Sequence, residues 1–172
     1  MADSPTAGNI QVQYCSLVMS KFISAAYWQD LDIFELHRKL ESLMDKAHEA
    51  LTDMYGPAQC GSFRAGFYDP ESNQFIKIPT CSEGVFHNLC EYEQYQEYCD
   101  GRCWPVHLAY CEWDIELSEK FGLPVLRMEA VEDWADEYSV DTLPEWCFYI
   151  DGLQVGLNSR GDLVAFDYAL PV

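Results

Sequence analysis

The chain has 172 residues, 49% of them hydrophobic, and it carries 29 acidic against 10 basic side chains, for a formal net charge of −19. This apolar content excludes a chain that stays disordered for want of hydrophobic residues, and the length allows one domain with its own core. The negative charge disfavours binding to nucleic acid or anionic membranes and favours cationic partners. We therefore expect a single domain over residues 1–172, with residues 1–9 as a flexible N-terminal tail.

The N-terminal third predicts a strand followed by a long helix. Residues 10–20 alternate partly between apolar and polar side chains, which suits a strand buried on one face. Asp32 and Glu35 then have the spacing of a capping box, and apolar residues recur every three or four positions until a Gly-Pro pair. The sequence predicts an amphipathic helix over about 32–55, whose mixed exposed charges are typical of a scaffold element.

The middle of the chain predicts a hairpin and three further helices. The apolar segments SFRAGFY and FIKIP flank the turn-rich residues DPESNQ, which indicates two strands joined by a loop of about six residues. Thr80 and Glu83 repeat the capping-box spacing and start a helix that runs to about Tyr98. A third helix is predicted over about 107–121 and a fourth over about 127–138.

The C-terminal residues predict a three-strand meander. Asp151-Gly152 and residues 158–161 are turn sequences that separate three apolar segments. Strands therefore group at both ends of the chain, with about four helices between them and no alternation of strand and helix. This order predicts an α+β fold with a mainly antiparallel sheet, made of the N-terminal strand, the central hairpin and the meander.

The acidic excess is concentrated in the second half of the chain. Residues 1–80 carry ten acids and six bases, whereas residues 81–172 carry nineteen acids and four bases. Placed on the predicted third and fourth helices, the acids fall opposite apolar stripes, and in the fourth helix Arg127 is the only base. The acids within such a row repel one another, which is unfavourable in the free protein. We therefore prefer an interpretation in which a cationic partner binds the row to one in which the row is purely structural.

Carboxylate rows interspersed with tyrosines are a usual composition for an interface with a basic protein. We therefore predict a non-enzymatic inhibitor or immunity-type protein that neutralises a basic partner, such as a toxin or a nucleic-acid-acting enzyme. A DNA-mimicking anti-restriction or anti-CRISPR protein is the alternative, since it also presents ordered carboxylates to a basic groove. The predicted partner-binding residues are Glu91, Glu93, Glu97, Asp100, Glu112, Glu116, Glu119, Glu129, Glu132, Asp133, Asp136, Glu137, Tyr95 and Tyr98.

The start MADSPTAGN lacks the basic and apolar regions of a secretory signal, and no apolar run approaches the roughly 18 residues that span a bilayer. We therefore expect a cytoplasmic protein that does not bind membranes, and eight reduced cysteines that mostly pack in the core.

One cluster of thiols and imidazole has a spacing that could hold zinc. Cys99, Cys103, His107 and Cys111 follow one another at intervals of four residues, although Pro105 interrupts any continuous helix between them. We predict no cofactor. A zinc-stabilised interaction domain and a small Cys/His enzyme stay open as alternatives, although no phosphate-binding loop, zinc-protease motif or nucleophile elbow is present.

Overall fold

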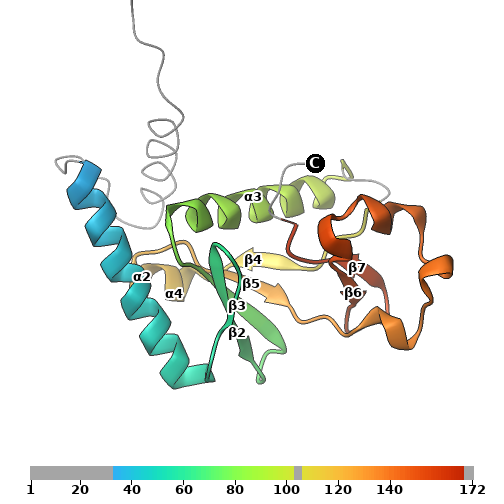
Figure 1. Cartoon of the computed structure of the whole chain (residues 1–172), viewed down its shortest axis with the longest axis horizontal. Coiled ribbons are helices and arrows are strands. Elements are labelled where there is room, and N and C mark those ends of the chain that lie inside the picture. The colour runs from blue at the N-terminus through green and yellow to red at the C-terminus, as the bar shows by residue number, and fades with distance from the viewer. Residues whose placement is uncertain (1–32, 103–105, 169–172) are drawn as a thin grey trace, which may run out of the picture.

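The structure is a computed structural model that describes residues 33–102 and 106–168 (Figure 1). The predicted strand over residues 10–20 and the predicted tail lie outside the described residues, as does Asp32 of the first capping box. Three α-helices occur in the described part of the chain, and they are α2 (Ile33–Tyr55), α3 (Ser82–Cys99) and α4 (Ile115–Phe121).

The described strands form two antiparallel sheets. The larger sheet has five strands in the order β1-β2-β3-β5-β4, namely β1 (Gln59–Cys60), β2 (Arg64–Asp69), β3 (Gln74–Pro79), β5 (Leu126–Glu129) and β4 (Cys111–Trp113). The smaller sheet pairs β6 (Val155–Leu157) with β7 (Leu163–Ala165). The predicted α+β class with a mainly antiparallel sheet is therefore confirmed, and so is the central hairpin, β2–β3.

Helix α2 confirms the predicted amphipathic helix, because its apolar stripe packs on one face of the five-stranded sheet. Met44 and Leu51 are buried against Phe67 of β2 and Ile76 of β3, which are cross-strand partners. Alternate side chains of a strand point to opposite faces, so Lys77 lies on the other face. Helix α3 covers that second face, where the Asn88 side-chain amide donates to the Lys77 carbonyl oxygen at 3.1 Å.

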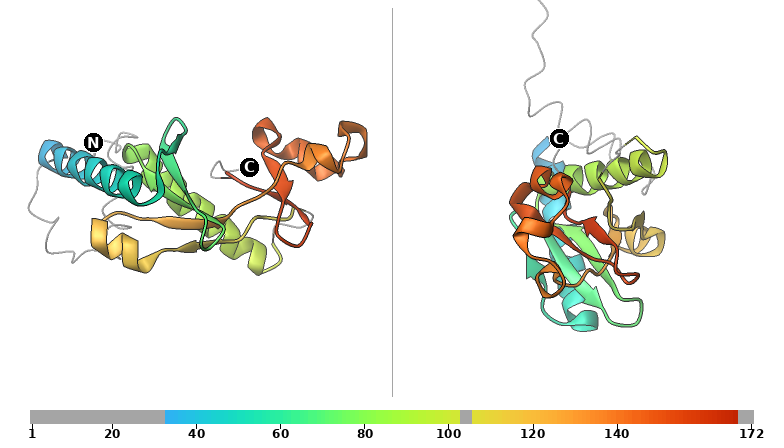
Figure 2. Two further views of the ribbon diagram at one scale, coloured as in Figure 1. Left: turned by 90° about the horizontal axis from the view of Figure 1, so that it is seen from below. Right: turned by 90° about the vertical axis from the view of Figure 1, so that its right-hand side faces the viewer.

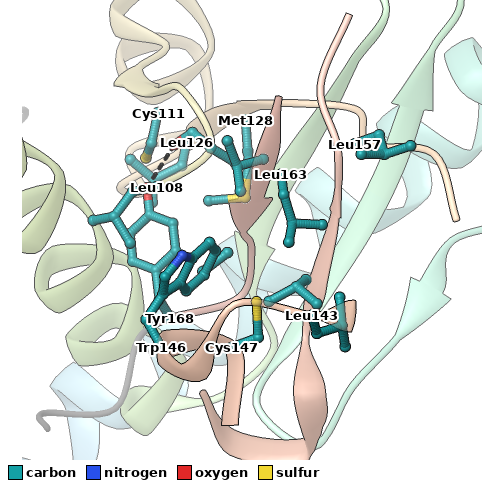
Figure 3. Close-up of a cluster of buried hydrophobic side chains, with 14 residues drawn as sticks. Leu108, Cys111, Leu126, Met128, Leu143, Trp146, Cys147, Leu157, Leu163 and Tyr168 are labelled. Atoms are coloured by element: carbon teal, nitrogen blue, oxygen red, sulfur yellow. Dashed lines mark hydrogen bonds between the residues drawn. The ribbon is translucent and has the colours of Figure 1, made fainter. Parts of the chain in front are cut away.

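A second apolar cluster joins β4 and β5 to the C-terminal hairpin (Figure 3). Met128 packs here with Leu108 and Trp146, all of them buried. The Tyr168 hydroxyl donates to the Ala109 carbonyl oxygen at 2.9 Å, so this buried polar group is satisfied. Two cores, one on each side of the large sheet, therefore hold the described fold together.

The predicted third helix is wrong over its first half. Residues 111–113 form strand β4, and α4 begins only at Ile115. Asp114 stops the strand and caps the helix, since its Oδ1 accepts the Leu117 N–H at 2.9 Å. Buried Cys111 and exposed Glu112 follow a two-residue period, which the pairing of β4 with β5 selects over the helical reading.

The predicted fourth helix is also wrong. Residues Leu126–Glu129 form β5, and only a short 3₁₀ turn, η2 (Trp134–Asp136), follows. Strand β5 is held on both faces, because Met128 enters the second core while Arg127, on the opposite face, pairs with Asp69 at 2.9 Å and Asp114 at 2.6 Å. These long-range partners outweigh the local helical pattern.

Two smaller predictions also differ from the structure. The first strand of the predicted meander is replaced by 3₁₀ turns, so that only the β6–β7 hairpin forms; the turns of this region are η3 (Val140–Thr142), η4 (Glu145–Tyr149) and η5 (Asp151–Leu153). Helix α3 is preceded by Cys81 at its N-cap, not by Thr80, whose backbone N–H instead donates to the Phe63 carbonyl oxygen at 2.9 Å.

None of the helices in the described ranges is both long and apolar enough to cross a membrane.

The six cysteines of the described ranges are free thiols. Cys111 and Cys147 are buried, whereas Cys60 and Cys99 are exposed. The prediction that most cysteines pack in the core is therefore wrong for these six.

Cys90, which is half-buried on α3, makes the fold sensitive to alkaline pH. Burial, reinforced by the negative charge of Glu93, raises the pKa of the Cys90 thiol from 9.0 to about 11. The folded state then binds more protons than the unfolded state in this window, so this contribution to stability is full below pH 9.0 and is lost as the pH rises through about 11. We expect the melting temperature to fall less steeply over this range in Cys90→Ala than in the unaltered protein.

The matched control is Cys60→Ala, which removes an exposed thiol. Its melting curve should follow that of the unaltered protein at each pH. Identical pH profiles for Cys90→Ala and Cys60→Ala would contradict the prediction.

Candidate functional site

The acids predicted on α3 divide between the surface and the interior. Glu93, Glu97 and Asp100 are exposed, whereas Glu91 is fully buried. The four acids differ because Glu91 faces the sheet, whereas Glu93, Glu97 and Asp100 face away from it. Glu91 is therefore part of the interior of the protein and cannot contact a partner directly.

The predicted tyrosine anchors are largely internal. Tyr95 and Tyr98 are half-buried against the second core, with their ring centroids 6.0 Å apart. The Tyr98 hydroxyl lies 3.3 Å from His107 Nδ1. These two rings contribute mainly to the packing of α3.

The predicted acidic row of the third helix survives only at Glu116 and Glu119, and that of the fourth helix does not form a helical face. Glu112 is exposed on β4, while Glu116 and Glu119 are exposed on α4. On β5, Glu129 Oε1 accepts the Tyr110 N–H at 2.7 Å. Glu132, Asp133 and Glu137 are exposed near η2, and Asp136 lies within that turn. The row of Glu129, Glu132, Asp133 and Asp136 is broken where the strand passes into irregular backbone.

An acidic surface of another architecture is formed by residues 130–153, which we call the acidic lobe, and it contains the predicted partner-binding residues Glu132, Asp133, Asp136 and Glu137. In Figures 1 and 2 the lobe, in orange, projects beyond the end of the five-stranded sheet. No lysine or arginine occurs between Met128 and Ser159, whereas eight acids do. The lobe is a succession of 3₁₀ turns, held to the second core by buried Leu143, Trp146 and Cys147.

The outer side of the lobe exposes large apolar side chains beside its carboxylates. Val140, Phe148 and Tyr149 are 55%, 49% and 61% exposed. The Tyr149 hydroxyl donates to Glu145 Oε1 at 2.8 Å, and this hydrogen bond raises the pKa of Tyr149. Because η4 is a tight turn, consecutive residues diverge: Trp146 and Cys147 point inward while Phe148 and Tyr149 point outward. This composition of aromatic side chains among acids suits contact with a basic protein.

A second feature is a cleft of about 690 Å³, which we call the charged cleft. It lies on the α3 side of the five-stranded sheet, between the β1–β2 connection, β3, α3 and the C-terminal segment after β7. Three phenylalanines line it, Phe63, Phe75 and Phe166. Its lining also includes the charged residues Arg64, Lys77 and Asp167.

Two cations and two carboxylates form an ion-pair network at the wall of the cleft. Arg64 pairs with Glu91 at 2.5 Å and also with Asp167. Lys77 Nζ lies 3.0 Å from Glu91 Oε1 and 3.4 Å from Asp167 Oδ1. The Gln154 side-chain amide donates to Asp167 Oδ2 at 3.4 Å. The two positive and two negative charges of the network cancel, and this pairing avoids the large cost of an unpaired buried charge.

The environment of the network differs between its members. Glu91 has no exposed side-chain surface, and Arg64 and Lys77 expose 10% and 13% of theirs, whereas Asp167 exposes 41%. Burial lowers the pKa of Lys77, although attraction to Glu91 opposes this effect. Glu91 is therefore the fixed anion of the network, and Asp167 is the anion in contact with solvent.

The charged cleft was missed at the level of the sequence. One signal was present, because a two-residue period places Lys77 on the same strand face as the apolar Phe75 and Pro79. A lysine on such a face is rarely buried unless it is paired. The identity of its partners lay beyond sequence reasoning, since Asp167 is 90 residues away.

The candidate zinc ligands do not converge within the described part of the chain. Cys99 is exposed at the end of α3, and Cys111 is buried in β4, where burial raises the pKa of its thiol. His107 packs against the rings of Tyr98 and Trp146. Cys103 lies outside the described residues, and the described ranges hold no group of three or more His, Cys, Asp or Glu side chains arranged for a metal ion.

Comparisons with protein-family models, with curated proteins and with solved structures find no match to this chain.

Proposed function

We propose that this protein is a non-enzymatic inhibitor or immunity-type protein that binds a basic partner protein, and that the acidic lobe is its contact surface. The observation that carries the proposal is the coincidence of exposed Phe148 and Tyr149 with a stretch of chain that has acids and no bases. The partner-binding region thus moves from helical faces to the 3₁₀ turns after β5.

The physical argument has two parts. Exposed aromatic side chains supply most of the binding energy at protein interfaces when a partner covers them. The surrounding carboxylates, including Asp141, Glu145 and Asp151, attract a basic partner, which raises the association rate and disfavours acidic competitors. Exposure of these apolar side chains in the free protein is unfavourable, and burial in a complex removes that penalty.

The test uses the full chain as bait for proteins of its source cell, with captured proteins identified by mass spectrometry and then purified for affinity measurements. A variant that combines Asp141→Lys with Glu145→Lys should bind the basic partner at least about tenfold more weakly, as should Phe148→Ala. The control combines Glu116→Lys with Glu119→Lys, which changes the net charge equally at two exposed acids of α4.

The control should retain the affinity of the unaltered protein. Equal losses in the lobe variant and the α4 variant would mean that the partner senses net charge and not the acidic lobe, and would contradict the proposal.

The alternative of DNA mimicry has a separate test on the same purified partner. The complex is challenged with duplex DNA. A partner that holds the DNA and this protein at the same time excludes mimicry, whereas mutually exclusive binding favours it.

A further inference from the structure

The charged cleft contains two cations that play no part in the proposed contact of the acidic lobe with a basic protein. On a protein of net charge −19, it is a place where two cations converge on one cavity. Arg64 pairs across the hairpin with Pro79, and Lys77 with Gly66, so the two cations are diagonal neighbours on the same face of β2 and β3. Both lie at the wall of the same cavity.

The charge balance of the network leaves one anionic position open to exchange. Glu91 is held by α3 without any exposed surface, and it neutralises one of the two cations. The other cation requires a second anion, because an unpaired buried charge is strongly unfavourable. Asp167 supplies it from the C-terminal segment, with 41% of its side chain in contact with solvent. Asp167 is therefore the member whose carboxylate can turn to solvent when an external anion takes its place beside the two cations.

The rest of the cavity favours an aromatic body with a single charge. Its volume of about 690 Å³ is within the range of roughly 300–1,000 Å³ that is typical of small-molecule sites. Phe63, Phe75 and Phe166 supply apolar walls that suit a flat ring system. Glu129 and Asp151 also line the cavity, and they would repel a second negative group on the ligand.

We propose that the charged cleft binds a small aromatic monocarboxylate, whose carboxylate replaces Asp167 as the partner of Arg64 and Lys77. The ligand ring lies against the three phenylalanines. The cavity shares Val131 and Asp151 with the acidic lobe, but Arg64 and Lys77 lie outside the lobe, so this proposal and the proposed contact with a basic protein can fail separately.

The first test uses the unaltered protein and three probes of the same ring size, measured by isothermal titration calorimetry. 2-Naphthoate should bind at least about tenfold more tightly than the neutral 2-naphthalenemethanol, since a charge-assisted pair is worth a decade or more in affinity. It should also bind more tightly than 2,6-naphthalenedicarboxylate. An acidic protein repels anions in general, so tighter binding of the acid than of the alcohol requires a local cationic site. Equal binding of the two probes would overturn the proposal.

The second test changes the exchangeable anion. Asp167→Asn removes the internal competitor and should tighten 2-naphthoate binding by about tenfold or more. The matched control removes one acid that does not line the cavity, Asp162→Asn on the β6–β7 turn. It should change the affinity by less than about twofold, because this carboxylate does not pair with the two cations. Equal effects of Asp167→Asn and Asp162→Asn would mean that only the net charge of the protein matters, and would refute the exchange.

A third variant keeps the test decisive if Asp167→Asn does not fold. Gly66 lines the cavity, and a Cβ atom built on it would lie 3.6 Å from a ring carbon of Phe75, an ordinary contact. The Cβ atom itself is therefore accommodated, and β-branched residues suit strands, so we expect Gly66→Val to fold, to fill part of the cavity and to weaken 2-naphthoate binding by about tenfold or more. Undiminished binding in Gly66→Val would place the probe elsewhere on the protein and overturn the assignment.

Discussion

Glu91→Ala is expected to lower the free energy of unfolding by about 3–5 kcal/mol. The substitution removes the carboxylate that pairs with both Arg64 and Lys77, and it leaves these buried cations with Asp167 alone. It also leaves a gap in a helix face that is packed against the sheet. Urea denaturation followed by circular dichroism measures the loss.

A matched control lies two residues further along α3. Glu93 is exposed, and Glu93→Ala should change the stability by less than about 0.5 kcal/mol. Glu91→Gln keeps the shape of the side chain but removes its charge, so we expect an intermediate loss. A decrease below about 1 kcal/mol for Glu91→Ala would contradict the view that the network is an interior element of the fold.

Gly84→Ala is the second substitution with a large expected effect. In an exposed helix, alanine in place of glycine stabilises by about 1 kcal/mol. Gly84 is instead buried in the first turn of α3, where an added Cβ would lie 2.0 Å from the Phe63 carbonyl oxygen and 3.0 Å from the Pro79 Cα atom. Both obstacles are backbone atoms, so α3 must shift away from the hairpin. We expect a loss of about 2 kcal/mol or more, opposite in sign to the helix-propensity effect.

Thermal denaturation of Gly84→Ala and of Gly66→Ala decides this prediction. At Gly66 the same added methyl group makes only ordinary contacts of 3.6 Å and 3.8 Å, so Gly66→Ala should leave the melting temperature close to that of the unaltered protein. A melting temperature for Gly84→Ala at or above that of Gly66→Ala would show that α3 can move without strain.

The elements that were predicted correctly are those whose signal is local. Helix α2 repeats its apolar stripe over six turns, so the predicted range of about 32–55 agrees with the observed Ile33–Tyr55. The β2–β3 hairpin has its turn residues between two apolar segments, and α3 has a clear stop at Gly101, which adopts a positive φ of 75°. In each case the residues that decide the structure lie within a few positions of one another.

Residues 111–113 and 126–138 differ from their predicted helices because their apolar segments are short. In LRMEAVEDW, residues spaced by two and residues spaced by three or four are both apolar, so either period fits. Strand pairing resolved the ambiguity: Met128 of β5 lies opposite Phe75 of β3 and Cys111 of β4. Partners on other strands, of which Phe75 is 53 residues and Cys111 is 17 residues from Met128, carry no local signal.

The sequence by itself determined that the protein is acidic, that its acidic excess follows residue 80, and that no base interrupts residues 128–159. These are properties of composition, which folding does not change. Only the tertiary structure decided which acids meet solvent and which meet a base. Glu91 and Glu93 are equivalent in sequence, yet the first is buried between Arg64 and Lys77 and the second is exposed. The pairing of Arg64 with Asp167 closes a separation of 103 residues, which depends on two sheets and a helix being packed together.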